Sequence, residues 1–242
     1  MRYLTLLYGR EEDNPEPGTP EFDADMAGYM RFDEVAGTAI VSGEPLQGTT
    51  TVVTVRPGDG APLVTAGPFA EGAEAIGGFY VLETGTLDDA IELVQQIPAV
   101  HNGTIELRPL VEWFARDDVS SAGNGGALRF LALIQDLPGA SDVPGTAEWD
   151  AGAAAHGRFG EAAGDAVLAG GALHPADTAT TVRVRDGEAI LSDGPFAETA
   201  EVVGGVYLLA APTVEAAAEL AARIPVGAKG AIELIPIMEL GD

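Results

Sequence analysis

The 242-residue chain contains no cysteine. This absence excludes disulfides, thiolate metal sites and a cysteine nucleophile, and it fits a cytoplasmic protein. Lysine is almost missing as well, since Lys229 is the only one, and 12 basic residues face 38 acidic ones for a net charge of −26. Such a surface repels itself and offers no basic stripe for phosphates, so we expect no direct binding to nucleic acid.

Long apolar runs are missing too. None approaches the roughly 20 residues that a membrane-spanning helix needs, so we expect no membrane association. The opening segment MRYLTLLYGREED turns acidic at once and has no small-residue cleavage site, which favours a first strand over a signal peptide. Histidine occurs three times, without HExxH spacing. We therefore expect no metal site, and the residues imply no cofactor.

The chain does contain a long internal repeat. AGPFAE at 66–71 returns as DGPFAE 127 positions later, and 22 of the 44 residues from 66 to 109 are identical to their partners at that offset. TTTVVTVR (49–56) matches TATTVRVR (178–185) at an offset of 129, which predicts two extra residues in a loop of the first copy. The repeat predicts two domains of ordinary size. Their expected bounds are 1–114 and 128–242, with a flexible linker at 115–127.

Each copy shows the same order of expected elements. Gly43 and Gly170 would close the first helix of each copy. The glycine pairs at 77–78 and 204–205 suggest bulges or a close backbone approach inside strands. This order is typical of a ferredoxin-like α+β fold of βαββαβ type. The expected elements of the first copy are strands at 2–8, 49–56, 76–83 and 103–110 and helices at 23–41 and 86–97, each with a counterpart in the second copy.

An antiparallel sheet with helices on one face leaves its other face bare. We therefore expect the two copies to pack sheet on sheet as an intramolecular pseudo-dimer. The chain would then be a monomer, or would associate further as a homodimer.

Three motifs resemble those of a known family. They are GPFAE–x–x–E–x–x–GG–x–Y, an Ala-rich helix ending in Ile-Pro, and G–x–IEL–x–P. The chain is similar to YCII-related proteins and, more narrowly, to DGPF (DGPFAETKE) domain proteins. It departs from the motif at Ala66, which stands where the motif has Asp, and at Ala73 and Ala200, which stand where it has Lys.

The resemblance implies the dimeric α+β barrel fold. It also implies a pocket for a small molecule, because relatives with this barrel include cofactor-free enzymes. A second implication is a non-catalytic regulatory module with a protein partner linked to an extracytoplasmic-function sigma factor. An enzyme and a non-catalytic module both fit these residues.

Candidate site residues come from the DGPF segment and from polar residues present in both copies. Asp193 and Glu198 are the candidate catalytic pair, acting as general acid or base at the barrel mouth. The alternative is that Asp193 caps a turn. His156 is a further candidate base. Arginine, glutamate and tyrosine could hold a small anionic or polar ligand; the candidates are Arg2, Arg56, Glu71, Tyr80, Arg108, Arg129, Arg185, Tyr207 and Glu233.

A structural interpretation of the same residues is open as well. A partly buried glutamate needs a paired base or a hydrogen-bond donor, so the repeated glutamates could serve the core. Repeated tyrosines on strands usually pack against neighbours with the hydroxyl at the edge. Phe69 and Phe196 would then fill the core beneath the GPF turns.

Overall fold

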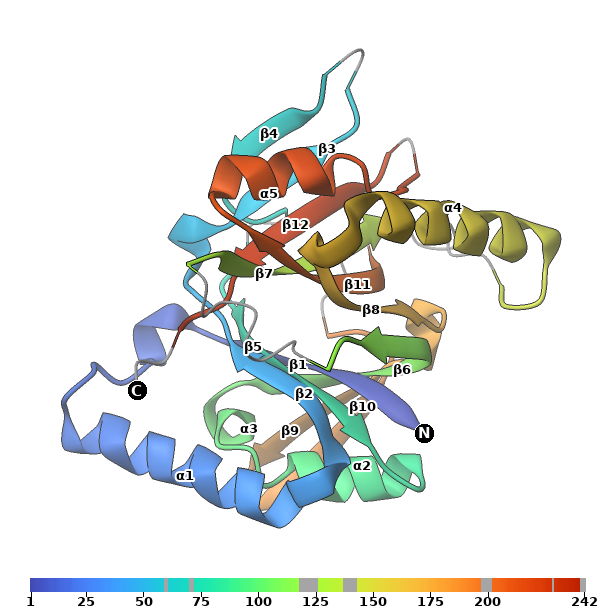
Figure 1. The fold of residues 1–242 in the computed structure, drawn as a ribbon. Coiled ribbons are helices and arrows are strands. Elements are labelled where there is room, and N and C mark those ends of the chain that lie inside the picture. The colour runs from blue at the N-terminus through green and yellow to red at the C-terminus, as the bar shows by residue number, and fades with distance from the viewer. Residues whose placement is uncertain are drawn as a thin grey trace. The chain divides into compact units, whose positions relative to one another are not determined.

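The structure is a computed structural model, and neither of its two compact units is a single sequence repeat. It describes residues 1–58, 61–69, 72–117, 126–136, 143–196, 202–227 and 229–239 (Figure 1). Unit 1 comprises Met1–Pro45, Gly72–Pro109 and Asp177–Glu198, and unit 2 comprises Leu46–Glu71, Leu110–Ala176 and Thr199–Asp242. Each unit is an antiparallel sheet with few helices, so the predicted α+β class is confirmed.

The sheet of unit 1 has the strand order β2-β5-β1-β6-β9-β10. Helices α1 and α2 contribute apolar side chains to the same core, where Phe32 and Val94 meet Ile105 and Val182. The elements are β1 (Arg2–Gly9), α1 (Pro20–Ala36), β2 (Ile40–Pro45), β5 (Ala75–Glu83), α2 (Leu87–Val94), α3 (Ala99–Asn102), β6 (Thr104–Ala115), β9 (Thr180–Arg185) and β10 (Glu188–Asp193).

The sheet of unit 2 repeats this order as β8-β11-β7-β12-β3-β4, and the end of β6 pairs with β8. Phe159 of α4 and Leu220 of α5 pack into its core with Phe130 and Leu234. The elements are β3 (Val53–Arg56), β4 (Leu63–Ala66), β7 (Leu128–Asp136), α4 (Ala147–Ala163), β8 (Val167–Leu173), β11 (Val202–Ala211), α5 (Val214–Ala221) and β12 (Ala231–Pro236). Single 3-10 turns lie at Glu11–Asp13, Gly37–Ala39, Thr49–Thr51, Gly164–Ala166 and Ala176–Thr178.

Each repeat supplies a β-hairpin to the unit built mainly by the other repeat. The β9–β10 hairpin of the second repeat pairs with β6 of the first, and the β3–β4 hairpin of the first pairs with β12 of the second. Val182 of β9 is fully buried in unit 1, and Val55 of β3 is buried in unit 2. The bounds of the sequence repeats thus do not coincide with those of the compact units. This exchange was not predicted, and the sheet-on-sheet barrel stays a prediction.

The hydrogen-bond register corrects the alignment of the hairpins. Thr181 lies opposite Glu106, and Thr54 lies opposite Glu233, so the two threonines are equivalent at an offset of 127. Arg56 therefore corresponds to Arg183, and the predicted offset of 129 is wrong. Both hairpin strands are rich in Thr and Val, and letter identity alone favoured a pairing that is slipped by two residues.

The predicted ends of the first helices are also wrong. The helices begin after the N-caps Thr19 and Thr146, whose hydroxyls accept the backbone N–H three residues on, and they end at Ala36 and Ala163. The residues that follow, Gly37 and Gly164, have positive φ angles of 49° and 55°, which favour glycine. Gly43 and Gly170 lie instead inside β2 and β8.

The bulges predicted at the glycine pairs are confirmed. The register between β1 and β5 shifts where Gly77 is skipped, and that between β7 and β11 shifts where Gly204 is skipped. The proposed linker at 115–127 falls largely on residues outside the described ranges, and β6 runs as far as Ala115. No helix within the described ranges is long and apolar enough to cross a bilayer.

Candidate functional site

A buried glutamate holds each GPF turn against a strand: Glu106 of β6 in unit 1 and Glu233 of β12 in unit 2. In unit 1, the backbone N–H of Phe196 donates to Oε2 of Glu106 at 2.9 Å, and Arg108 donates to Oε1 of Glu106 at 3.3 Å. Glu106 and Arg108 are 2% and 1% exposed, so this ion pair is shielded from water. The arrangement fastens the exchanged hairpin to β6.

Unit 2 has the corresponding contact with different chemistry. Glu233 accepts a hydrogen bond from the Gln135 side chain at 3.0 Å and another from the backbone of Phe69. Burial raises the pKa of Glu233. The side-chain partner of the glutamate is therefore a neutral amide from β7 in unit 2 and an arginine of β6 itself in unit 1. We call each contact, Glu106 with Arg108 or Glu233 with Gln135, the glutamate clasp of its unit.

Arginine side chains cover the phenylalanines of both turns. The Arg56 guanidinium lies 4.6 Å from the ring centre of Phe69, and that of Arg183 lies 4.9 Å from the ring centre of Phe196. The Thr54 and Thr181 hydroxyls each donate to the carbonyl of the turn glycine at 2.9 Å. Polar residues that recur in both copies thus hold the hairpins in place.

The other predicted ligand-binding arginines lie in separate places. Arg2 pairs with Glu83 at 2.7 Å, and Arg129 pairs with Glu239 at 3.0 Å. The Arg185 guanidinium donates to the carbonyl of Val184 and to three carbonyls around the end of α3, those of Val100, His101 and Gly103.

Of the predicted catalytic pair, Asp193 is exposed at the end of β10. Glu198 lies outside the described residues, as does Glu71 of the ligand-binding set. The roles assigned to these residues stay predictions.

Unit 2 contains a cavity of about 650 Å³ beneath α4. One face of α4 lines it with Trp149, His156 and Gly160, while strands of the sheet add Ile134 and Tyr207. Successive members of this set are seven and four residues apart, so they share one face of the helix. A cavity of this size can hold a small organic molecule.

A histidine and a tyrosine meet inside this cavity. His156 Nδ1 lies 2.9 Å from the hydroxyl oxygen of Tyr207. Burial lowers the pKa of His156, while burial and the charge of Glu112 raise the pKa of Tyr207 to about 12. Both side chains are therefore neutral near pH 7. A neutral imidazole is able to exchange a proton or a hydrogen bond with a ligand.

The backbone beneath Tyr207 fixes the position of its ring. Tyr207 lies directly across from Gly170 in the β8–β11 register. A Cβ atom added to Gly170 would lie 2.7 Å from the Tyr207 ring, so only glycine allows this approach. Phe159 packs edge-on to the same ring at 5.4 Å.

The same place in unit 1 carries larger side chains. At the offset of 127, His156 corresponds to Tyr29 and Gly160 corresponds to Asp33. Tyr29 packs against the core, and Tyr80 packs on Phe32 with ring centres 5.0 Å apart. Burial raises the pKa of Tyr29 to about 12, so Tyr29 does not titrate near neutral pH as a histidine would.

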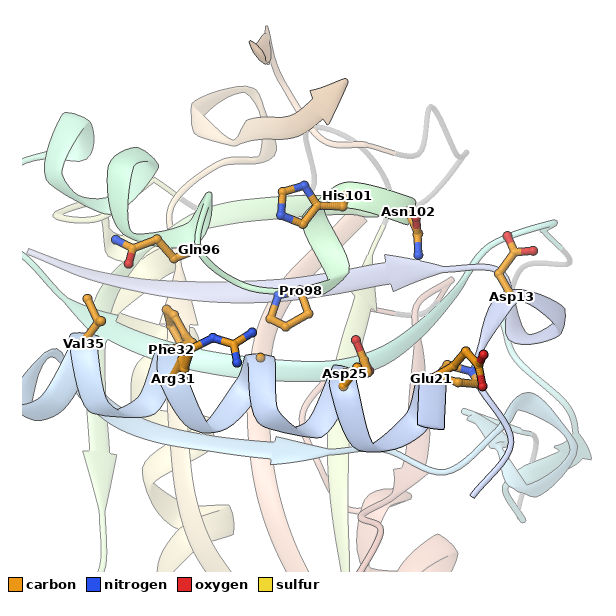
Figure 2. Close-up of a pocket in the computed structure, with 13 residues that line it drawn as sticks. Asp13, Glu21, Asp25, Arg31, Phe32, Val35, Gln96, Pro98, His101 and Asn102 are labelled. Carbon is orange, nitrogen blue, oxygen red and sulfur yellow. The ribbon is translucent and has the colours of Figure 1, made fainter. Parts of the chain in front are cut away.

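Unit 1 has a groove elsewhere, between α1 and the segment 96–102. Figure 2 shows Arg31 and Asp25 on the helix below Pro98 and His101, and the groove measures about 850 Å³. Arg31 and His101 are exposed. Water therefore competes for any ligand that these two side chains would hold.

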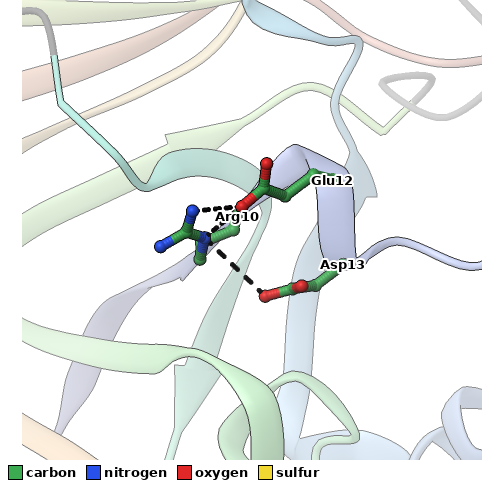
Figure 3. Close-up of polar contacts among 3 residues, drawn as sticks. All are labelled: Arg10, Glu12 and Asp13. Atoms are coloured by element: carbon green, nitrogen blue, oxygen red, sulfur yellow. Dashed lines mark hydrogen bonds and ion pairs between the residues drawn. The ribbon is translucent and has the colours of Figure 1, made fainter.

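Asp13 reaches the rim of this groove from the 3-10 turn that precedes α1. Arg10 pairs with Glu12 and also lies 4.0 Å from the Asp13 carboxylate, as the dashed lines in Figure 3 mark. Because all three side chains are exposed, these pairs hold the turn only loosely. The cavity of unit 2, where a buried tyrosine contacts a partly buried histidine, is the better candidate site.

Comparison with known proteins places the chain in a family. The family model for the YCII-related domain matches residues 1–114 and again residues 128–241. The chain belongs to the YCII-related family. The family resemblance inferred from the motifs is thereby confirmed, and this YCII-related protein carries the domain twice.

One curated relative is an uncharacterized protein of Rhizobium meliloti (strain 1021). It is 36% identical over 109 residues, which are 44% of this chain and 82% of that relative. The similarity thus covers most of the relative but less than half of this tandem YCII-related chain.

Sequence reasoning found Tyr207 and His156 but missed the rest of the cavity lining. Trp149, Phe114 and Glu112 occur outside the repeated motifs, and Gly160 looked like an ordinary helix residue. A difference between the two copies could have indicated the cavity: α4 has Gly160 at the position where α1 has Asp33. Within the described residues, no group of three or more His, Asp or Glu side chains could hold a metal ion.

Proposed function

We propose that this YCII-related protein binds a small organic molecule in the cavity of unit 2. The observation that carries the proposal is the His156–Tyr207 pair, which lies in a cavity of about 650 Å³ lined by both apolar and acidic side chains. Binding pockets typically combine apolar walls with a few convergent polar groups that orient the ligand. Tyr207 would donate or accept a hydrogen bond, and His156 would add a second polar contact.

The same pair supports a proton-transfer role for His156. Its neutral state near pH 7 leaves it able to take a proton from a bound molecule, without a cofactor. Asp193 does not line this cavity. The sigma-factor-linked partner stays a prediction from the resemblance.

A cavity-filling variant tests the binding proposal. In Gly160→Leu, the new side chain starts from a position where an added Cβ meets no atom within 4 Å. It should fill the cavity while favouring the helix by about 1 kcal/mol. The matched control is Ala154→Leu, which changes an exposed residue of α4 that does not line the cavity.

Thermal-shift screening against a metabolite library is the measurement. A ligand present at about 100 times its Kd stabilises the native protein by about 2.7 kcal/mol. Ligands that stabilise the wild type and Ala154→Leu, but not Gly160→Leu, would support the proposal. Equal shifts in all three proteins would rule the cavity out as the binding site.

A further inference from the structure

The charged groups that line the cavity of unit 2 are carboxylates. Glu112 comes from β6, Asp136 from β7 and Glu161 from α4, and the lining includes no lysine or arginine. Glu112 and Glu161 are exposed, and neither forms an ion pair within the described part of the chain. The other two titratable groups, His156 and Tyr207, are neutral near pH 7. The cavity therefore has a negative potential that its own walls do not cancel.

The charge of Glu112 extends to the polar pair in the cavity. It helps to raise the pKa of Tyr207, which places a negative potential at the hydroxyl that contacts His156. An anionic ligand would be repelled at this point, whereas a cation would be attracted. The candidate arginines that could have held an anion lie outside this lining, in the ion pairs, ring contacts and carbonyl contacts described above.

The remaining wall is apolar and partly aromatic. Trp149 and Phe114 line the cavity together with Ile134 and Tyr207, and the Phe114 and Tyr207 rings meet at 6.5 Å. Aromatic faces attract cations as well as apolar groups. This wall suits the hydrocarbon part of a ligand.

From these observations we infer that the cavity takes a protonated amine carried on an apolar or aromatic body. The ammonium group lies toward Glu112 and Glu161, and the body lies against Trp149, Phe114 and Ile134. The inference rests on the proposed function, since it names the class of ligand for the same cavity.

Three probes of matched shape test the charge preference. They are 2-phenylethylamine, 2-phenylethanol and 3-phenylpropanoate, titrated by calorimetry at near-physiological salt. We expect the amine to bind at least about threefold more tightly than the alcohol, and the carboxylate to bind most weakly. Equal binding of the three, a tighter alcohol or carboxylate, or no amine binding would overturn the inference.

Charge-matched variants separate the cavity from the general acidity of the protein. Glu112→Gln combined with Glu161→Gln should remove most of the preference for the amine. Glu148→Gln combined with Glu188→Gln removes the same net charge at exposed positions outside the cavity, and it should keep the preference. An equal loss in both double variants would show that long-range charge, and not the cavity, selects the amine.

Gly160→Leu distinguishes the failure of this inference from that of the proposed function. If the probes bind without regard to charge and Gly160→Leu abolishes binding, the cavity is a binding site but the amine preference is wrong. If amine binding survives in Gly160→Leu, the cavity is not the site, and both proposals fail.

Discussion

Units 1 and 2 share a strand order and a helix arrangement, yet they differ along one helix face. Unit 2 has His156 and Gly160 on α4 and a cavity beneath them, whereas unit 1 has Tyr29 and Asp33 at the same positions of α1. Residues that recur in both copies, such as Glu106 and Glu233, hold the exchanged hairpins. In this duplicated protein, the residues that the two copies share maintain the fold. A site can arise at the positions where the copies differ.

The largest expected effect comes from breaking the glutamate clasps. Glu106→Ala should destabilise the protein by about 3–5 kcal/mol, because it removes a carboxylate partner of the buried Arg108. Glu233→Ala should cost only about 1–3 kcal/mol, because its side-chain partner Gln135 is neutral. Urea denaturation measures both losses. Equal losses would contradict the difference between the clasps.

The next effect tests the hairpin exchange. Val182→Ala leaves a small cavity in the core of unit 1 and should cost about 2 kcal/mol. Although Val182 belongs to the second repeat, amide hydrogen exchange should accelerate in Arg2–Gly9 more than in Leu128–Asp136. The opposite pattern would mean that each repeat folds on its own sheet.

A smaller effect compares the two tyrosines of the equivalent strands. Tyr207→Phe removes the hydroxyl that contacts His156 and should cost about 1 kcal/mol. Tyr80→Phe should be nearly neutral, because no hydrogen bond of the Tyr80 hydroxyl is found within the described residues. Thermal unfolding of the two variants gives the comparison, and a larger loss for Tyr80→Phe would reverse it.

The smallest effect is a dependence on pH that only unit 2 should contribute. The pKa of His156 is lowered in the folded protein, so the unfolded chain binds this proton more readily. Stability from His156 is therefore present above the ordinary histidine pKa and is lost as the pH falls through the folded value. His156→Phe should flatten the change in unfolding free energy between neutral and mildly acidic pH. An unchanged slope would show that His156 is not held neutral by burial.

Much of the fold could be predicted from the sequence. The repeat identified two copies of one α+β pattern, and glycine pairs inside strands indicated bulges that β1–β5 and β7–β11 contain. The exchange of hairpins could not be predicted, since a Thr/Val-rich hairpin can pair with the edge of β6 as well as with that of β12. For the same reason the sequence alignment of the two hairpins was wrong by two residues, and it paired Arg56 with Arg185 in place of Arg183.

The cavity was harder to predict than the fold. Reasoning from shared residues selected Arg56, Glu233 and other residues that make clasp and stacking contacts in the structure. A cavity forms where side chains leave space unfilled. Gly160 has no side chain whose chemistry would mark it in the sequence as part of a site. The informative pattern is the difference between α1 and α4, which acquires a meaning only when both helices are placed on their sheets.

The most direct measurement is an NMR titration of the histidine side chains with 2-phenylethylamine. His156 lines the cavity of unit 2, His101 lines the groove of unit 1, and His174 lines neither. We predict that the imidazole signals of His156 shift as the amine is added while those of His101 and His174 stay in place. Movement of His101 with an unchanged His156 would contradict the assignment of the site to unit 2.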